Sequence, residues 1–310
     1  MEKCIDVSIV IINFFTADYI KTVISSIVEK TDNVFYEIII VDNSESDDEF
    51  AKLKLLSKFC KVTLVKAPYN MGFGKANNLG AKYSSGRYLF FLNPDTYLVN
   101  NAIFLLKEFL DLNASTSIVG PNIFNDNLNP NHSYYLNEKN LKNERVFLKF
   151  FKKIKKVISK KRDDFNYSSK AKEVKGYVSG AALMIRTNDF IAVNGFDEDI
   201  FMYDDETFLC FKVRQQLKQK IFNVPSSKIV HLEGGSFGDA SLKRQKMMLD
   251  GTAIYFLKAF GVNDCLKFLN AQKNICLIKK NIFLFNKNKK TKYNRLMNLY
   301  KKKIMEIKAL

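Results

Sequence analysis

Residues 7–12 read VSIVII and residues 37–42 read EIIIVD, and these two runs decide the fold. Both are short, continuous and rich in β-branched residues, which is typical of strands buried on both faces of a sheet. Residues 62–65 and 88–92 have the same character. Four segments between and after these runs suit helices: residues 17–30, 47–59, 74–84 and 100–113. The alternation predicts an α/β fold with a mostly parallel central sheet and helices on both of its faces.

The composition is that of a globular protein. Of the 310 residues, 47% are hydrophobic and 26% are charged, so the chain can bury a large core. Its apolar runs fall short of the roughly 18 residues that a membrane-spanning helix needs, and the N-terminal segment carries no cleavage signature, so we expect no signal peptide. Five scattered cysteines without a CxxC pair favour free thiols in a reducing cytoplasm over a zinc site or a disulfide framework.

The net charge of +17 is unevenly distributed along the chain. Residues 241–310 carry a net charge of +14 and residues 139–175 carry +10, which leaves −7 for the remainder. Because the charge is concentrated in two segments, the pattern predicts an acidic body with basic extensions and differs from that of a uniformly basic protein.

The chain is expected to divide into a body, residues 1–240, and a basic helical extension, residues 241–310. Within the body, residues 1–124 hold the alternating strands and helices, which is a Rossmann-like, nucleotide-binding arrangement. Residues 125–175 are rich in Asn, Lys and aromatic residues and are interpreted as an insertion of loops and helices. A regular pattern returns in residues 176–240.

Polar residues follow the predicted strands at the edge where ligands of parallel sheets bind. Asn13 and Asp42 end the first two strands, and Asn93-Pro94-Asp95 follows the fourth. The Asp95 carboxylate could hold a hard cation that bridges two phosphates, although Asn-Pro-Asp also suits a plain turn. Asp42 could accept a hydrogen bond from a nucleobase, or could cap the helix that follows it.

A glycine-bearing loop, residues 70–80 (NMGFGKANNLG), leads into the third helix. Small residues there permit a phosphate or ribose to approach the backbone at the helix start. The loop lacks the glycine spacing of the dinucleotide fingerprint and of the phosphate-binding loop, so by itself it is a weak signal.

Two further segments contain groups suited to catalysis. Asp204-Asp205-Glu206 places three adjacent acids at the start of a helix, where mutual repulsion raises at least one pKa and suits a general base or a metal site. A solvated helix start is the alternative. His231 ends an apolar run before a glycine pair, so it could be a ligand at a strand end, or a structural histidine.

Taken in chain order, these segments resemble the family 2 glycosyltransferases, especially their rhamnosyltransferase-like branch. Any one segment is weak, but seven in the right order, covering about residues 6–238, are specific. The matching segments are residues 7–13, 38–44, 70–74 with Asn77 and Gly80, 91–95, 179–186, 194–206, and His231 with Gly234 and Ser236.

The resemblance implies a GT-A fold, a nucleotide-diphosphate sugar donor and inversion at the anomeric carbon. It places Asp95 and His231 at a site for a divalent metal, Mg²⁺ or Mn²⁺. By register Glu206 is the catalytic base and Asp205 its neighbour, with the assignment between the two left open. The positions implied for the nucleotide-sugar are Asn13, Asp42, Asn70, Gly72, Asn77, Asn93 and Gly180.

The sequence departs from the family pattern at four places. Asn93 replaces the first acid of an Asp-x-Asp motif, which leaves Asp95 as its only charge. The usual Glu-Asp pair is reversed to Asp205-Glu206. An acid two positions after the base is Phe208 here, and an Asn near the first strand is replaced by Phe15.

The resemblance implies a glycan acceptor, often linked to a lipid diphosphate, and a dTDP- or UDP-sugar donor, such as dTDP-rhamnose. The Lys/Asn/Phe-rich composition suggests an AT-rich bacterial genome, and hence surface polysaccharide synthesis. Basic amphipathic helices in residues 241–310 suit an anionic membrane surface, which predicts a cytoplasmic protein peripheral to the membrane. A solvated face or a homo-oligomer contact is the alternative.

Three other functions compete with this interpretation. A nucleotidyltransferase would carry a glycine-rich, basic loop after the first strand, where residues 12–16 read INFFT. A basic nucleic-acid-binding protein would use the lysines and aromatic residues of 275–300, but this charge lies away from the site segments, so we expect no nucleic-acid partner. The third is an inactive transferase homologue that only binds a membrane or nucleic acid.

Overall fold

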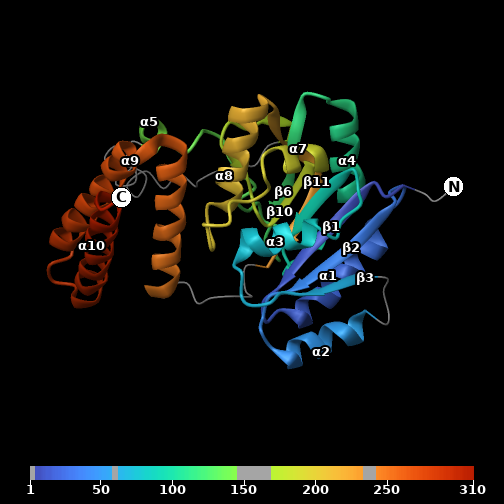
Figure 1. The fold of residues 1–310 in the computed structure, drawn as a ribbon, viewed down its shortest axis with the longest axis horizontal. Coiled ribbons are helices and arrows are strands. Elements are labelled where there is room, and N and C mark those ends of the chain that lie inside the picture. The colour runs from blue at the N-terminus through green and yellow to red at the C-terminus, as the bar shows by residue number, and fades with distance from the viewer. Residues whose placement is uncertain (1–3, 58–61, 145–168, 233–241) are drawn as a thin grey trace. The chain divides into compact units, whose positions relative to one another are not determined.

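The structure is a computed structural model that describes residues 4–57, 62–144, 169–232 and 242–310 (Figure 1). Residues 145–168 of the expected insertion lie outside the described residues, as do Gly234 and Ser236. Contacts divide the chain into two compact units, Met1–Glu138 with Asp164–Phe237, and Lys139–Asp163 with Gly238–Leu310. The segment 125–175 is therefore divided between the larger and the smaller unit.

The larger unit is built on one mixed sheet (Figure 1). In spatial order its strands are β3 (Val62–Lys66), β2 (Tyr36–Asp42), β1 (Val7–Asn13), β4 (Tyr88–Leu92), β10 (Ala182–Arg186), β6 (Thr116–Phe124), β11 (Lys220–His231) and β5 (Thr96–Leu98). The first four of these are parallel to one another, as the sequence predicted. Strand β10 is antiparallel to both neighbours, β6 and β11 are parallel, and β5 is antiparallel to β11. The short β8 (Lys172–Glu173) also pairs with β11.

Both faces of the sheet are covered, because successive residues of β1 point into different cores. Ile9 and Ile11 belong to a core that includes helices α1 (Ala17–Lys30), α2 (Asp47–Leu56) and α4 (Ala102–Leu112). Val10 and Ile12 belong to a core that includes helices α3 (Phe73–Ala81), α7 (Thr187–Ala192) and α8 (Asp205–Lys212). The prediction of an α/β fold with helices on both faces is confirmed (Figure 1).

The long strands β6 and β11 were not expected from the sequence. Strand β6 contains Gly120, Pro121 and Asn122, which interrupt the β-branched pattern, yet all of its residues are buried. The amide of Asn223 in β11 donates to the carbonyls of Gly120 and Pro121, at 3.3 and 2.9 Å. A Cβ on Gly120 would lie 2.7 Å from the Cβ of Val178, so close packing explains the glycine.

Two smaller features border the sheet. Strands β7 (Tyr134–Tyr135) and β9 (Tyr177–Val178) pair antiparallel, and the rings of Tyr135 and Tyr177 stack with centroids 5.7 Å apart. Helix α8 continues into a π-helical turn, η1 (Val213–Leu217). Arg214 of this turn donates to the carbonyl of Gly176, which ties the turn to the segment leading into β9.

The described part of the smaller unit is helical, as expected for the C-terminal residues. It contains α5 (Leu141–Glu144), α9 (Leu242–Ile282) and α10 (Lys287–Lys308). Helix α9 is kinked at the exposed Gly261, whose φ of 83° is in the left-handed region. The ring of Phe256 stacks on Phe268 across the kink, with centroids 4.2 Å apart. Asp250 of α9 forms an ion pair with Lys303 of α10, with Oδ1 and Nζ 2.6 Å apart, which joins the two helices.

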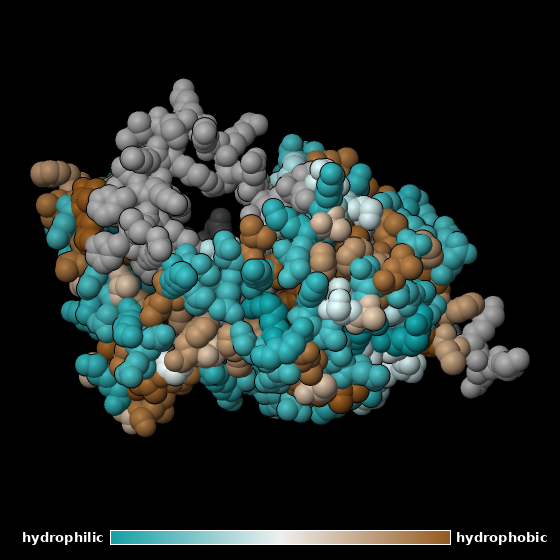
Figure 2. All heavy atoms as spheres, turned by 90° about the horizontal axis from the view of Figure 1, so that it is seen from above, coloured by the Kyte–Doolittle hydropathy of each residue, from teal (hydrophilic) through white to brown (hydrophobic). Residues whose placement is uncertain are grey.

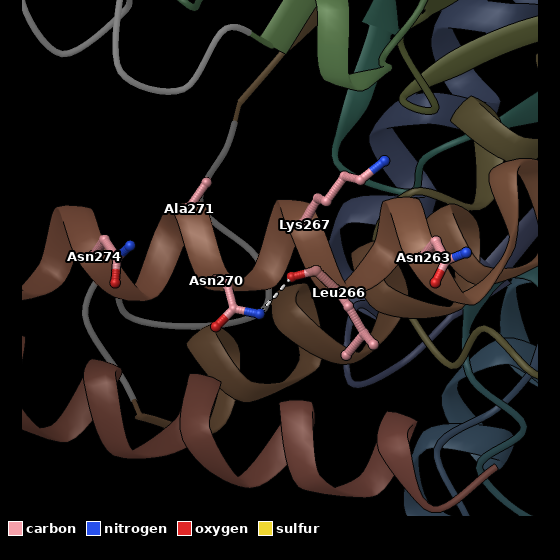
Figure 3. Close-up of a pocket in the computed structure, with 6 residues that line it drawn as sticks. All are labelled: Asn263, Leu266, Lys267, Asn270, Ala271 and Asn274. Carbon is pink, nitrogen blue, oxygen red and sulfur yellow. Dashed lines mark hydrogen bonds between the residues drawn. The ribbon is translucent and has the colours of Figure 1, made fainter.

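The surface is mostly polar, with scattered apolar side chains (Figure 2). No helix within the described ranges is long and apolar enough to cross a bilayer. A shallow hollow of about 570 Å³ lies on α9 and is lined by Asn263, Leu266, Lys267, Asn270, Ala271 and Asn274 (Figure 3). All six residues belong to one helix, so the hollow is an open depression and not an enclosed ligand cavity.

The packing of α3 on β1 gives a stability prediction. A Cβ on Gly80 would lie 2.4 Å from Cγ1 of the buried Val10, so Gly80→Ala should lower the free energy of unfolding by about 1–3 kcal/mol through overpacking. In a Val10→Ala background the clashing methyl is gone, and the same change should cost less, because alanine favours a helix over glycine by up to ~1 kcal/mol. Urea denaturation of the four proteins in this cycle measures the coupling. Equal costs in both backgrounds would contradict the packing explanation.

Candidate active site

Asn13 and Asp42 lie side by side at the carboxyl edge of the sheet, since they are partners in the β1–β2 register. The Asn13 side-chain amide donates to Oδ1 of Asp42 at 2.9 Å, and both side chains are buried. Asn13 Oδ1 also accepts hydrogen bonds from the backbone and the hydroxyl of Thr16, both at 3.0 Å. In this structure Asn13 therefore positions Asp42 and the turn into α1.

The carboxylate of Asp42 is satisfied on one oxygen only. Its Oδ1 also accepts from the amide and hydroxyl of Ser44, at 3.2 and 2.7 Å. Its Oδ2 is buried without a hydrogen-bond partner in the described part of the chain. The alternative role of Asp42 as a helix cap is wrong, because Ser46 caps α2 by accepting from the amide of Glu49. A ligand N–H group that donates to this oxygen would remove the free-energy cost of leaving a buried acceptor without a hydrogen bond.

Asn43, which sequence reasoning missed, fastens the glycine loop to the end of β2. Its side-chain amide donates to Oδ1 of Asn70 and to the carbonyl of Gly72, at 3.1 and 3.3 Å. Its Oδ1 accepts from the amide of Met71 at 2.8 Å. Asn70 Oδ1 in turn accepts from the amide of Gly72 at 3.2 Å. The loop is thus held in one conformation beside Asp42.

Gly72 is required by the protein backbone itself. Its φ is 78°, and a Cβ there would lie 2.1 Å from the carbonyl oxygen of Phe201. The next residue, Phe73, donates its amide to this same carbonyl at 2.8 Å. The sequence led us to expect a ligand close to the backbone at this loop. At Gly72 the group in close contact is instead the carbonyl of Phe201, in the segment that precedes the acidic cluster.

Two asparagines of α3 have structural contacts. Asn77, expected at the nucleotide-sugar site, is buried and donates to the carbonyl of Phe73 within its own helix, at 3.0 Å. Asn78, which sequence reasoning did not single out, donates to the carbonyl of Phe196 at 2.9 Å and accepts from its amide at 2.8 Å. This pair of bonds joins α3 to the loop that carries the acidic cluster. The Asn78 side chain bonds to both the amide and the carbonyl of one distant residue, and no sequence pattern marks an asparagine with this role.

The acidic cluster begins with unusual backbone geometry. Tyr203 and Asp204 have φ values of 70° and 67°, a left-handed pair that non-glycine residues rarely adopt. Helix α8 then starts at Asp205, whose side chain is 1% exposed. The alternative of a solvated helix start therefore does not hold for Asp205. A Cβ on Gly74 would lie 2.6 Å from its Oδ1, so this glycine makes room for the carboxyl.

Burial, and then the charge of Glu206, raise the pKa of Asp205 well above its usual 3.8. The backbone amides of Asp205 and Gly74 oppose this rise, but neither carboxyl oxygen has a hydrogen-bond partner of good geometry among the described residues. Such a group favours its neutral form. Its ionised form is disfavoured because burial removes water and no well-placed donor replaces it.

Glu206 is the more accessible of the two acids. It is partly exposed, and a Cβ on Gly180 would lie 3.4 Å from its Oε2. Phe208, at the position where the family has a further acid, is buried and packs against Phe211. Phe15, the other aromatic departure, is 57% exposed after β1. Glu206 therefore reaches the surface beside Gly180, whereas Phe208 belongs to the core.

Asp95 and His231 are neighbours despite their separation in sequence. The antiparallel pairing of β5 with β11 sets Thr96 opposite His231. Oδ1 of Asp95 then lies 3.2 Å from Nε2 of His231, and the side-chain amide of Asn93 lies 3.5 Å from the same nitrogen. The backbone amide of Asn93 also donates to the carbonyl of Ala181 at 2.9 Å. This bond links Asn93, Asp95 and His231 to the segment that contains Gly180.

The Asp95–His231 pair fits a divalent cation that also binds a diphosphate. Carboxylate oxygen and imidazole nitrogen are both ligands of such ions. Among the described residues, no group of three or more His, Cys, Asp or Glu side chains is arranged so that it could hold a metal ion. A cation at this pair would therefore take its remaining ligands from diphosphate oxygens and water, as Mg²⁺ commonly does.

Solved structures and curated proteins with similar chains support this reading of the fold. The structure of GalNAc-T7 with UDP, GalNAc and Mn²⁺, a GT-A glycosyltransferase, aligns with a TM-score of 0.56 at 15% identity. The alignment covers 80% of this chain and 48% of that one, so the chain spans about half of its length. The α/β fold is therefore of the GT-A type.

Among curated proteins, the rhamnosyltransferase WbbL of Escherichia coli is 24% identical over 73% of this chain and 83% of its own. The Haloferax volcanii hexosyltransferase Agl10, of low-salt glycan biosynthesis, is 26% identical over 68% of this chain and 62% of its own. The Escherichia coli glucosyltransferase WfaP is 34% identical over 34% of this chain and 41% of its own.

The family model of the glycosyl transferases of family 2 matches residues 8–187. This range contains Asp42, Asp95, the glycine loop and Gly180, whereas His231 and the acidic cluster lie beyond it. The resemblance identified from the sequence motifs is thereby confirmed. The chain belongs to glycosyl transferase family 2.

Proposed function

We propose that the chain is a metal-dependent, inverting glycosyltransferase that moves a sugar from a dTDP- or UDP-sugar to a hydroxyl of a growing bacterial surface glycan. The observation that carries the proposal is the contact between Asp95 and His231, 3.2 Å apart at the sheet edge where Asp42 also ends its strand. A metal-diphosphate site and a base-recognising carboxylate at one sheet edge suit a nucleotide-diphosphate donor.

Asp42 would recognise the nucleobase. Its Oδ2 is buried and has no hydrogen-bond partner among the described residues. The N–H of a pyrimidine ring is a donor of the right kind. Asn13 and Ser44 hold the other oxygen, so the acceptor is fixed in place before the donor binds.

Glu206 would be the general base, and Asp205 its positioning neighbour. Asp205 is buried and its pKa is raised by that burial and by the charge of Glu206, whereas Glu206 is partly exposed beside Gly180. The Glu206 carboxylate takes the proton of the acceptor hydroxyl as that oxygen forms a bond to the anomeric carbon. The bond from this carbon to the diphosphate oxygen breaks on the opposite side, and the nucleoside diphosphate leaves with the electron pair, which inverts the configuration.

Asp95 and His231 would hold the divalent cation, with Asn93 beside them. The cation, Mg²⁺ or Mn²⁺, supplies positive charge that stabilises the departing diphosphate. The side chains of Asp95 and His231 are only 11% and 19% exposed, so the pair is already ordered and little reorganisation is needed when the donor binds.

The relatives guide the choice of donor and acceptor. The name of WbbL describes rhamnosyl transfer, and that of WfaP describes transfer from UDP-Glc to a GlcNAc-diphosphoundecaprenol. For this chain we therefore favour dTDP-rhamnose or a UDP-hexose as donor and a lipid-linked glycan as acceptor. The basic residues of 241–310 would hold the enzyme on the anionic inner face of the cell membrane.

The alternative is an inactive transferase fold that only binds a membrane or nucleic acid. The departures at Asn93 and Phe208 motivate it. Donor hydrolysis distinguishes the two functions: no nucleotide release with any UDP-, dTDP- or GDP-sugar, with or without Mn²⁺ and Mg²⁺, would favour the inactive homologue.

Loss of the base should affect turnover and not donor binding. Glu206→Gln is expected to lower kcat for nucleotide release by about 10²–10⁴-fold, the usual contribution of a general base. The dissociation constant of the nucleotide-sugar, measured by calorimetry, should stay within a few-fold of the wild type. Glu198→Gln is the control, because that acid is 52% exposed and pairs with Lys75 on the surface. A small loss in Glu206→Gln with a large one in Asp205→Asn would reverse the assignment.

Metal and nucleotide should stabilise the protein together. In thermal-shift assays a nucleotide near 100 times its Kd stabilises by about 2.7 kcal/mol, and we expect Mn²⁺ to increase this effect in the wild type. Asp95→Asn and His231→Ala should lose the metal-dependent increment and keep the rest, whereas Asp42→Asn should weaken binding of the nucleotide with or without metal. Retention of the metal increment in both of the first two variants would exclude this cation site.

The raised pKa of Asp205 predicts the pH dependence of stability. Its folded-state pKa lies above the unfolded value, so its contribution is fully present below the usual pKa of 3.8 and is lost as pH rises through the folded value. Asp205→Asn removes this group, and should raise the melting temperature more at neutral than at mildly acidic pH. Calorimetry at a series of pH values measures the difference. A pH-independent difference would show that the carboxyl is ionised without penalty.

A further inference from the structure

The turn between α9 and α10 presents apolar side chains to solvent. Ile282 and Leu284 are 55% and 50% exposed, and Phe285 is 103% exposed, so the described residues leave it fully open to solvent. A fully exposed aromatic ring loses the free energy that burial would supply. Apolar side chains are also visible at the left end of Figure 2, where the C-terminal helices lie.

Hydrogen bonds join this turn to both helices. The amide of Phe283 donates to the carbonyl of Lys279 at 3.0 Å, which continues the last turn of α9. The side chain of Asn286 caps α10 by accepting from the amide of Lys289 at 3.0 Å. Lys289 also lies over the ring of Phe283, 4.5 Å from its centroid. These contacts involve residues on either side of Phe285, so the backbone conformation of the turn leaves the Phe285 side chain exposed.

Positive charge surrounds this apolar tip. Between residues 279 and 292 the chain has six lysines, and it has no acidic residue between 265 and 305. Lys287, Lys290 and Lys292 are exposed, and the nearby sequence offers them no carboxylate. Exposed apolar side chains surrounded by lysines suit an anionic bilayer, because aromatic rings enter the headgroup boundary and lysines pair with lipid phosphates.

We propose that residues 282–285 form a membrane-inserting tip and that the surrounding lysines bind anionic phospholipid headgroups. The proposal deepens the membrane association suggested above by naming the segment that enters the bilayer. Nucleic acid would account for the lysines, but it leaves the aliphatic Ile282 and Leu284 without a role. The membrane accounts for both features, so it is the partner that the exposures favour.

The absence of tryptophan from the chain allows a direct test. In the full-length protein, Phe285→Trp introduces the only indole, and Leu112→Trp is the matched control at a 77% exposed site on α4. With phosphatidylglycerol vesicles at low salt, the indole at position 285 should shift its emission to the blue and be protected from an aqueous quencher. The control indole should not change, and phosphatidylcholine vesicles should have little effect on either protein.

A second pair of variants measures the affinity. Phe285→Glu should lower partitioning onto phosphatidylglycerol vesicles by about tenfold or more, whereas Leu112→Glu, with the same change of charge, should remain near the wild type. Both sites are exposed, so neither change should disturb folding, which circular dichroism checks. The proposal is overturned if the indole at 285 does not respond to these vesicles, if both Glu variants bind equally, or if the indole responds to duplex DNA and not to vesicles. None of these measurements depends on sugar transfer, so they leave the proposed activity to be judged separately.

Discussion

The burial of β1 on both faces is the constraint on which the rest of the larger unit depends. Every residue from Val7 to Asn13 is buried, so the middle of the strand is apolar and its polar side chains stand near its two ends. Asn13 and Asp42 occupy the carboxyl ends of β1 and β2, and the same edge receives the turn after β4. A sheet that excludes water from both faces concentrates its polar chemistry on one edge.

The second half of the sheet completes this edge through antiparallel strands. Strand β10 reverses direction beside β4, so the segment before it, which contains Gly180, meets the residues that follow β4. The backbone amide of Asn93 donates a hydrogen bond to the carbonyl of Ala181 at this point. Strands β5 and β11 then run antiparallel and set His231 beside Asp95. Both groups of candidate ligands therefore depend on pairings between segments that are distant in the chain.

The sequence predicted the first half of the fold well, because strands 7–13, 36–42 and 88–92 are buried on both faces and their apolar pattern is continuous. It missed β6, since Gly120, Pro121 and Asn122 interrupt the apolar pattern of a fully buried strand, and the bonds that Asn223 of β11 donates to the Gly120 and Pro121 carbonyls connect residues distant in sequence. Among site residues, the acids and His231 were identified by their chemistry. Asn43 and Asn78 were not, because their importance lies in hydrogen bonds to distant backbone atoms.

The bond between Phe73 and the carbonyl of Phe201 has a consequence for how this enzyme can diversify. The glycine loop beside Asp42 and the segment leading into the Asp204-Asp205-Glu206 cluster share this contact, and Gly72 leaves no room between them. A substitution that reshapes one loop for a different nucleotide must displace the other. Variants with altered donor preference are therefore expected to need paired changes in residues 70–74 and 196–205. The two segments should accordingly change together in evolution.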